Sequence, residues 1–188
     1  NIPHYQRPYK WSVKNVNQLI DDIVLFQKKS AYRLGTIVMH NENIENQTVL
    51  NLVDGQQRSI TITLIYYALL QYKKETLYKL NYAKDLIKTE PHLLKSLFTN
   101  DITKYNIQNN YREIVRRVTD FDEALIDFFL RKCEFVKVEL YDISEAFQFF
   151  DSQNARGKDL EPHDLLKAYH LRELNNKTTE SNKINIVS

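Results

Sequence analysis

Cysteine and glycine are scarce in this chain, and each shortage excludes a class of protein. A single cysteine, Cys133, rules out an internal disulfide framework. With only five scattered histidines beside it, we expect no structural zinc site. The chain has three glycines, where an average chain of this length carries roughly a dozen. Three dispersed glycines cannot form the phosphate loop of Walker A proteins.

Long apolar runs and a strong net charge are also missing. No segment approaches the length needed to cross a bilayer, and residues 1–4 lack the layout of a signal peptide. We therefore expect a cytoplasmic protein with no membrane partner and, since no initiator methionine is present, a piece of a longer chain. The 26 Lys and Arg and 24 Asp and Glu give a formal charge of +2. Any DNA contact must then come from a local patch of charge.

What the chain does contain predicts one folded domain. Of its 188 residues, 43% are hydrophobic and 27% are charged, which is far from the composition of a disordered chain. Each glycine lies in a candidate motif: Gly35 in the apolar run 34–39, Gly55 before a helix-like stretch, and Gly157 after Arg156. We expect these positions to need a positive φ or a close approach of the backbone, with three ordinary turns as the alternative.

The most informative segment is Val53-Asp54-Gly55-Gln56-Gln57-Arg58, which lies between an apolar run and a helical pattern. The backbone N–H of a glycine can approach an anion closely, and a guanidinium offers a planar fork of donors that suits phosphate oxygens. The segment therefore predicts a phosphate-binding turn. The alternative is an ordinary turn between strand and helix in which Asp54 caps the helix and Arg58 is solvated.

Hydrophobic periodicity predicts the elements around this motif. Residues 2–11 are rich in proline and aromatics and should be extended. An amphipathic helix, capped by Ser12 or Asn15, should follow to about Lys28. Two strands at 34–39 and 48–53 should form a hairpin around a polar turn from His40 to Gln47. The stretch from Ser59 to about Lys74 is apolar on two sides, so we expect a helix near the centre of the fold.

The second half of the chain has a helical texture, with breaks at Pro91 and Asn100. One of its helices should carry a basic stripe (Arg112, Arg116 and Arg117) that could meet phosphate, although the acidic residues that interrupt it favour a solvated helix face. A strand is expected at 135–140. Two further helices should follow, one from Asp142 and a last one from Pro162.

Four segments in a fixed order resemble the N-terminal domain of GmrSD-type restriction systems. They are residues 2–11, 34–38, 53–58, and 150–160 running into 164–168, so the resemblance extends to about residue 170. It implies an α+β fold in which helices pack a small mixed β-sheet of the ParB and sulfiredoxin-like kind. The implied domain is 1–174, with its core in 1–75 and 133–174, an inserted helical lobe in 76–132, and a frayed end or linker in 175–188 toward a missing C-terminal region.

The resemblance also implies a function. Proteins of that family are modification-dependent, nucleotide-stimulated DNA endonucleases or related antiphage effectors, and their Asp-Gly-Gln-Gln-Arg motif is linked to binding and hydrolysis of nucleoside triphosphates. The implied activity is nucleotide hydrolysis with Mg²⁺, and no zinc, haem or flavin is expected. The implied partners are modified phage DNA and a C-terminal nuclease domain, in cis or in trans. The alternative is a non-catalytic module that senses nucleotide or modified DNA and regulates a nuclease elsewhere.

Carried over residue by residue, the resemblance assigns catalysis to Asp54, Gln57 and Arg58. Asp54 could bind Mg²⁺ directly or through water, or orient an attacking water. The implied nucleotide-binding residues form three walls of one cleft: Gly55, Gln56, Gln57 and Arg58; Tyr5, Gln6 and Arg7; and Asn154, Arg156 and Lys167. Tyr9 or Trp11 could add a base-stacking surface, although packing in the core is the favoured interpretation for both.

Two activities of related proteins are not expected here. The family's nuclease half carries a histidine-and-asparagine metal motif that nothing in this sequence matches, so DNA cleavage is not assigned to this chain by itself. The peroxiredoxin repair of sulfiredoxin relatives is disfavoured because Cys133 lies near a predicted strand, far in sequence from the motif.

Overall fold

The computed structural model describes residues 8–44, 47–88 and 101–141. The chain divides into two compact units, Asn1–Glu139 and Leu140–Ser188, and all but two of the described residues belong to the first. The elements predicted after Tyr141 lie outside these ranges, and so do residues 1–7.

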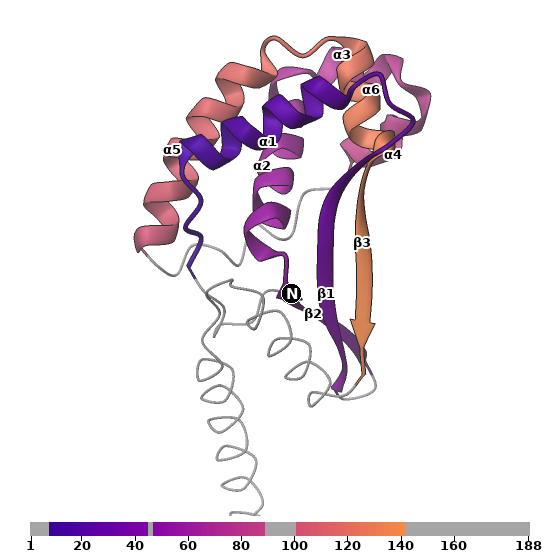
Figure 1. The fold of residues 1–188 in the computed structure, drawn as a ribbon. Helices are drawn as coiled ribbons and strands as arrows, with labels where there is room; N and C mark the ends of the chain where they lie inside the picture. The colour runs from indigo at the N-terminus through magenta and orange to yellow at the C-terminus, as the bar shows by residue number, and fades with distance from the viewer. Residues whose placement is uncertain (1–7, 45–46, 89–100, 142–188) are drawn as a thin grey trace, which may run out of the picture. The chain divides into compact units, whose positions relative to one another are not determined.

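The described part is α+β, as predicted. Its strands are β1 (Tyr32–Ile44), β2 (Gln47–Asp54) and β3 (Cys133–Leu140), and they form one sheet in the order β2-β1-β3. The β1 and β2 strands are antiparallel, whereas β1 and β3 run in the same direction (Figure 1), so the sheet is mixed. The helices are α1 (Val13–Phe26), α2 (Gln56–Tyr72), α3 (Lys74–Lys79), η1 (Asn81–Ala83, a 3₁₀ turn), α4 (Lys84–Ile87), α5 (Asp101–Val118) and α6 (Glu123–Lys132).

The amphipathic helix predicted after the N-terminal segment is α1. It buries one face, made by Val16, Leu19, Ile20 and Ile23. Ser12 is its N-cap, and both the backbone N–H and the hydroxyl of Ser12 donate to Asn15 Oδ1, at 3.0 and 2.9 Å. The two residues predicted as alternative caps therefore act together, because each satisfies polar groups of the first turn.

The hairpin is longer than the sequence predicts, and the polar turn expected from His40 to Gln47 is wrong. Strand β1 continues to Ile44, which pairs with Gln47 at the start of β2. Polar residues are tolerated here because a strand holds its partner through backbone hydrogen bonds and can face water on one side. A bulge interrupts the ladder at the other end of the hairpin, between Val38 and Met39, opposite the last residues of β2.

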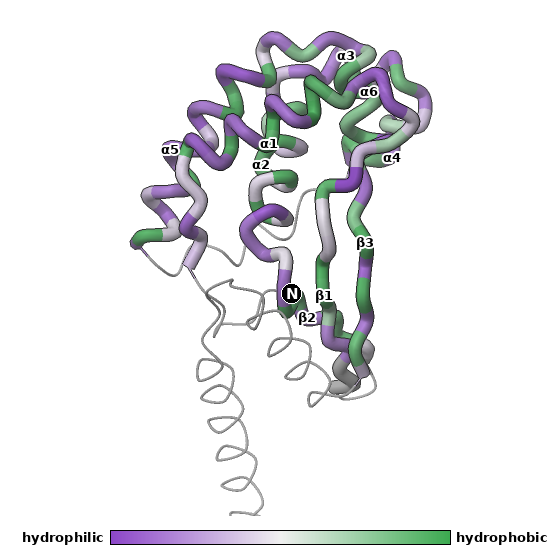
Figure 2. The backbone as a smooth tube through the Cα atoms, viewed as in Figure 1, coloured by the Kyte–Doolittle hydropathy of each residue, from purple (hydrophilic) through white to green (hydrophobic). Residues whose placement is uncertain are grey.

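Helix α2 lies at the centre of the first unit, between α5 and β1 (Figure 1). It buries residues on two sides, which explains its continuous apolar pattern: Ile60, Leu64 and Ala68 on one, Ile65 and Leu69 on the other. The same core takes in side chains from α3, α5 and α6, so the helices after α2 pack onto the helices before them. Hydrophobic and hydrophilic residues alternate along α1 and α5 (Figure 2). No helix in the described ranges is long and apolar enough to span a membrane.

Candidate functional site

The motif predicted to bind phosphate forms the junction between β2 and α2. Asp54 is the last residue of β2, and Gly55 is the N-cap of α2 with a left-handed backbone (φ 87°, ψ 8°). A Cβ at Gly55 would lie 2.8 Å from Ile37 Cγ2 and 2.9 Å from the carbonyl oxygen of Thr36, both on β1. Only glycine fits this turn, because a side chain would be strained and would collide with the neighbouring strand.

Arg58 lies across the other described glycine. Gly35, in β1, has φ 136°, and a Cβ there would come within 2.0 Å of Arg58 Nη1. The Arg58 guanidinium also lies over the Trp11 ring, with Cζ 5.9 Å from the ring centroid, which is within the range of a cation–π contact. Three of the segments singled out in the sequence, around Trp11, Gly35 and Arg58, therefore meet at one side chain.

The Arg58 guanidinium has no counter-charge in the described part of the chain. Its Nε is buried without a hydrogen-bond partner, and no ion pair joins its side chain to any described residue. The Asp54 carboxylate, four residues earlier, likewise forms no ion pair with any described residue. Burying part of a cation without a partner costs free energy, so such an arrangement favours a site that an anion completes.

The start of α2 adds positive potential to this region. Its first turn closes when the Ser59 backbone N–H donates to the Gly55 carbonyl at 3.0 Å, and the Ser59 hydroxyl donates to the same oxygen at 2.9 Å. The N–H groups that precede this bond point out of the helix start, where the dipole of a 17-residue helix attracts negative charge. Gln56, in this turn, is buried.

The Gln57 side chain forms hydrogen bonds with the backbone of the N-terminal segment. Its Oε1 accepts from the backbone N–H groups of Lys10 and Trp11, at 2.7 and 3.1 Å, and its Nε2 donates to the Pro8 carbonyl at 3.2 Å. These bonds place residues 8–11 beside the start of α2. Both polar atoms of the Gln57 amide therefore have partners within the protein.

Tyr9 is fully buried, so its interpretation as a core residue is confirmed and a base-stacking role for it is wrong. Its hydroxyl lies 2.7 Å from Thr61 Oγ1 and accepts from Asn110 Nδ2 at 2.9 Å. Burial raises the pKa of this hydroxyl. Trp11 is half-buried and packs against the core as well as Arg58. No sequence pattern indicated Thr61 and Asn110, because neither is near Tyr9 in the chain or part of a motif.

The remaining predicted ligands are not described. Tyr5, Gln6 and Arg7 precede Pro8, and Asn154, Arg156 and Lys167 follow Tyr141, so both sets lie outside the described residues. Their roles stay predictions.

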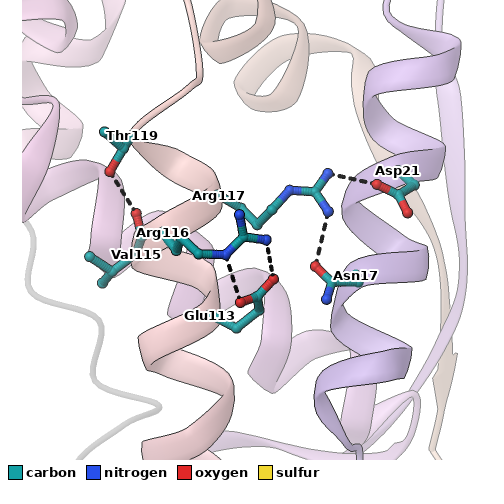
Figure 3. A network of polar contacts seen from close by, with 7 residues as sticks. All are labelled: Asn17, Asp21, Glu113, Val115, Arg116, Arg117 and Thr119. Atoms are coloured by element: carbon teal, nitrogen blue, oxygen red, sulfur yellow. Dashed lines mark hydrogen bonds and ion pairs between the residues drawn. The ribbon is translucent and has the colours of Figure 1, made fainter.

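Figure 3 shows two members of the basic stripe on α5: Arg117 contacts α1, whereas Arg116 pairs within α5. Arg117 donates to Asn17 Oδ1 at 2.9 Å and to Asp21 Oδ1 at 2.6 Å, both on α1. Arg116 donates twice to Glu113, at 2.9 and 2.6 Å. The interpretation as a helix face is thus favoured over a phosphate-binding stripe, because two of its three cations already have carboxylate partners.

Cys133 and the acidic residues give no second site. Burial raises the pKa of the Cys133 thiol to about 12, which keeps it protonated and a poor nucleophile at neutral pH. Within the described ranges, His, Cys, Asp and Glu form no group of three or more that could hold a metal ion. Asp54, at the end of β2, thus belongs to no such group among the described residues.

A family described as GmrSD restriction endonuclease, N-terminal domain, matches residues 1–171, a range that includes the junction between β2 and α2 and all the segments that meet at Arg58. No curated protein matches the chain.

Proposed function

Since the chain belongs to the family of GmrSD restriction endonuclease N-terminal domains, we propose that it binds and hydrolyses a nucleoside triphosphate at the junction between β2 and α2. The observation that carries the proposal is the Arg58 guanidinium, whose Nε is buried and unpartnered and whose side chain forms no ion pair within the described residues. A planar fork of donors in this state suits the oxygens of a phosphate group.

The surroundings of Arg58 support an anion of this kind. The guanidinium contacts both the bare backbone of Gly35 and the Trp11 ring, and these neighbours limit the directions in which it can point. Arg58 itself lies in the first turn of α2, where free backbone N–H groups and the positive end of the helix dipole favour an anion. Arg58 and the amides around Gly55 would then hold the phosphates together, and Gln56 and the predicted ligands of the other two walls would complete the site.

Asp54 is suited to a magnesium ion that accompanies the nucleotide. Mg²⁺ in nucleotide sites is held by one or two carboxylates, with phosphate oxygens and waters filling its other positions. Asp54 offers one carboxylate, without an ion pair in the described part of the chain and next to the glycine turn, so the donor set fits. When bound, the ion would neutralise charge on the phosphate oxygens. The other role of Asp54 would be to orient an attacking water.

A non-catalytic sensor is the second candidate, and Gln57 favours it. Of the three residues assigned to catalysis, Gln57 already has protein partners for both polar atoms of its amide. A module that binds nucleotide or modified DNA, and regulates a nuclease in cis or in trans, would need Arg58 but no catalytic glutamine. In either case modified phage DNA would be engaged by the full-length protein, with a nuclease domain that this chain does not supply.

The test follows phosphate release from GTP and ATP with Mg²⁺, together with the affinity for each nucleotide. We expect Arg58→Ala to weaken binding by about 10- to 100-fold, because charge-assisted hydrogen bonds to phosphate are lost. Asp54→Ala should reduce the rate of phosphate release far more than the affinity for nucleotide. Arg112→Ala, on the exposed face of α5, is the matched control and should change neither.

Two results would separate the candidates. Nucleotide binding without phosphate release by the unaltered chain, lost in Arg58→Ala, would establish the sensor and exclude hydrolysis. If the unaltered chain bound neither nucleotide, or if Arg58→Ala bound both as well as it does, the proposed site would be wrong.

A further inference from the structure

The N-terminal residues Pro8–Trp11, which we call the strap, run across the start of α2 and along α5. Almost all of their backbone polar groups are held by side chains of these two helices. Gln57 holds the Pro8 carbonyl and two N–H groups of the strap. From α5, Thr103 accepts from the Tyr9 N–H at 3.1 Å, Asn106 donates to the Tyr9 carbonyl at 2.8 Å, and Asn110 donates to the Trp11 carbonyl at 2.7 Å.

The strap belongs to no helix or strand, and no strand in the described ranges pairs with it. Backbone groups that leave water must find partners, and here amide and hydroxyl side chains take the place of a neighbouring strand. The Tyr9 side chain adds a fully buried anchor in the same place, between Thr61 of α2 and Asn110 of α5. The strap is therefore fixed by both helices at once.

Gln57 connects the strap to Arg58. It is the residue before Arg58 on α2, and it accepts from the backbone N–H of Trp11, whose ring covers the Arg58 guanidinium. Gly35 also lies against Arg58, next to its Nη1. A long side chain with several rotatable bonds loses entropy when a ligand fixes it, so a guanidinium held in advance binds more tightly than a free one.

We propose that Gln57 is a positioning residue, which holds the strap so that Trp11 fixes the Arg58 guanidinium for its anion. The two adjacent glutamines of the motif then differ in role, since Gln57 binds the protein's own backbone and acts on the ligand through Trp11 and Arg58. The ligand of Arg58 in this inference is the nucleoside triphosphate of the proposed function, on which the inference rests, while the contact of Gln57 with the strap stands by itself.

The protein contains its own probe for the first part of the test. Trp11 is the single tryptophan, so the intrinsic fluorescence of the chain reports the surroundings of this ring. We expect Gln57→Leu to shift the emission and to speed hydrogen exchange at the Lys10 and Trp11 amides, because their acceptor is gone. Gln71→Leu, an exposed glutamine on the same helix, is the matched control and should change neither.

Gln57→Glu provides a second variant if the leucine variant does not fold. It keeps an oxygen to accept from Lys10 and Trp11 and loses only the donor to Pro8. It should therefore retain most of the Trp11 emission and of the amide protection. Full loss of both in Gln57→Glu would contradict the role given to Oε1.

The second part measures the affinity for MgGTP and MgATP in a double-mutant cycle of Gln57→Leu and Arg58→Ala. We expect Gln57→Leu alone to weaken binding by about tenfold. In the Arg58→Ala background it should have almost no further effect, because a positioning residue has nothing left to position. Additive effects would mean that Gln57 contacts the ligand itself and would overturn the inference.

The two proposals fail in different ways. Unchanged emission and unchanged amide exchange in Gln57→Leu would overturn the positioning role whatever the nucleotide does. If the unaltered chain bound neither MgGTP nor MgATP, the proposed function would fall, while the emission and exchange data would still decide whether Gln57 holds Trp11 against Arg58.

Discussion

At the scale of single residues, the two described glycines are required for different reasons. A side chain at Gly55 would meet the backbone oxygen of Thr36 and the side chain of Ile37, which belong to a paired strand and cannot move away. A side chain at Gly35 would meet the guanidinium of Arg58, which can be displaced more readily than a strand backbone. Gly55 is therefore required by the fold, whereas Gly35 leaves room for the Arg58 side chain.

This difference leads to a prediction for Gly55→Ala. The left-handed backbone and the contact with Thr36 should together cost about 2 kcal/mol or more of folding stability. Urea unfolding followed by far-UV circular dichroism measures this cost.

Gly35→Ala is the informative comparison. This substitution also strains the backbone, but the added methyl displaces Arg58 before it displaces the strand. For the same loss of stability, Gly35→Ala should therefore lose more nucleotide affinity than Gly55→Ala. Equal losses of stability with unchanged nucleotide affinity in both variants would show that the position of Arg58 is unimportant.

At the scale of elements, α1 and α5 are joined by the polar network of Figure 3 as well as by their apolar faces. Glu113 lies within it, and the pKa of its carboxyl is lowered chiefly by the hydrogen bonds from Arg116, with smaller contributions from Asn17 and the charge of Arg117. Partial burial acts in the opposite direction. The ionised form of Glu113 is thus favoured in the folded state.

The lowered pKa predicts how stability depends on pH. The folded carboxyl has a lower pKa than the unfolded one, so its contribution is present above the ordinary value of 4.5 and is lost as the pH falls through the folded pKa. Glu113→Gln should therefore lose less stability than the unaltered chain between pH 5 and pH 3. The effect should be small, because Arg116 is largely exposed. Urea midpoints at both pH values test this prediction. An equal fall of the midpoint in Glu113→Gln and in the unaltered chain would contradict it.

Local sequence predicted α1, β1, β2, α2 and β3 one by one, but only a helical texture for the segment that holds α3 to α6. The spacing of Val16, Leu19 and Ile23 places α1 almost residue by residue, and Gly55 marks the boundary between β2 and α2. The polar half of the hairpin was mistaken for a turn because the pattern of its side chains carries no signal of backbone pairing. The ParB-like character of the sheet stays a prediction, since the structure confirms only a small mixed sheet packed by helices.

The candidate site was predictable only in part, for a related reason. Asp54, Gly55 and Arg58 are adjacent in sequence, so a motif can indicate them. The surroundings of Arg58 come from Trp11 and Gly35, 47 and 23 positions away, and the strap is held from α5 by residues about a hundred positions away. Such contacts follow from how the helices pack, which periodicity does not encode.

At the scale of the whole molecule, Tyr9 joins three distant parts of the chain through one buried hydroxyl. Tyr9→Phe keeps the ring but leaves Thr61 and Asn110 without a partner at that position. We expect a loss of about 1 to 2 kcal/mol of stability. The slope of unfolding against urea should not change, because the surface exposed on unfolding stays the same.

Tyr105→Phe is the matched control for this prediction, because Tyr105 is on α5 and 67% exposed. It should leave the urea midpoint where it is. Equal midpoints for Tyr9→Phe and Tyr105→Phe would mean that the buried hydroxyl contributes nothing.

The strap also has a consequence for the order in which the protein is made. Tyr9 is synthesised before Asn110, which donates to its hydroxyl and follows 101 residues later. At a translation speed of about 5 to 20 residues per second, the strap waits roughly 5 to 20 seconds for its partner. During that interval Asp54, Gly55 and Arg58 are already synthesised, but α5 is not yet present to hold the strap beside them. A nascent chain of this protein therefore carries its full motif well before it can assemble the site.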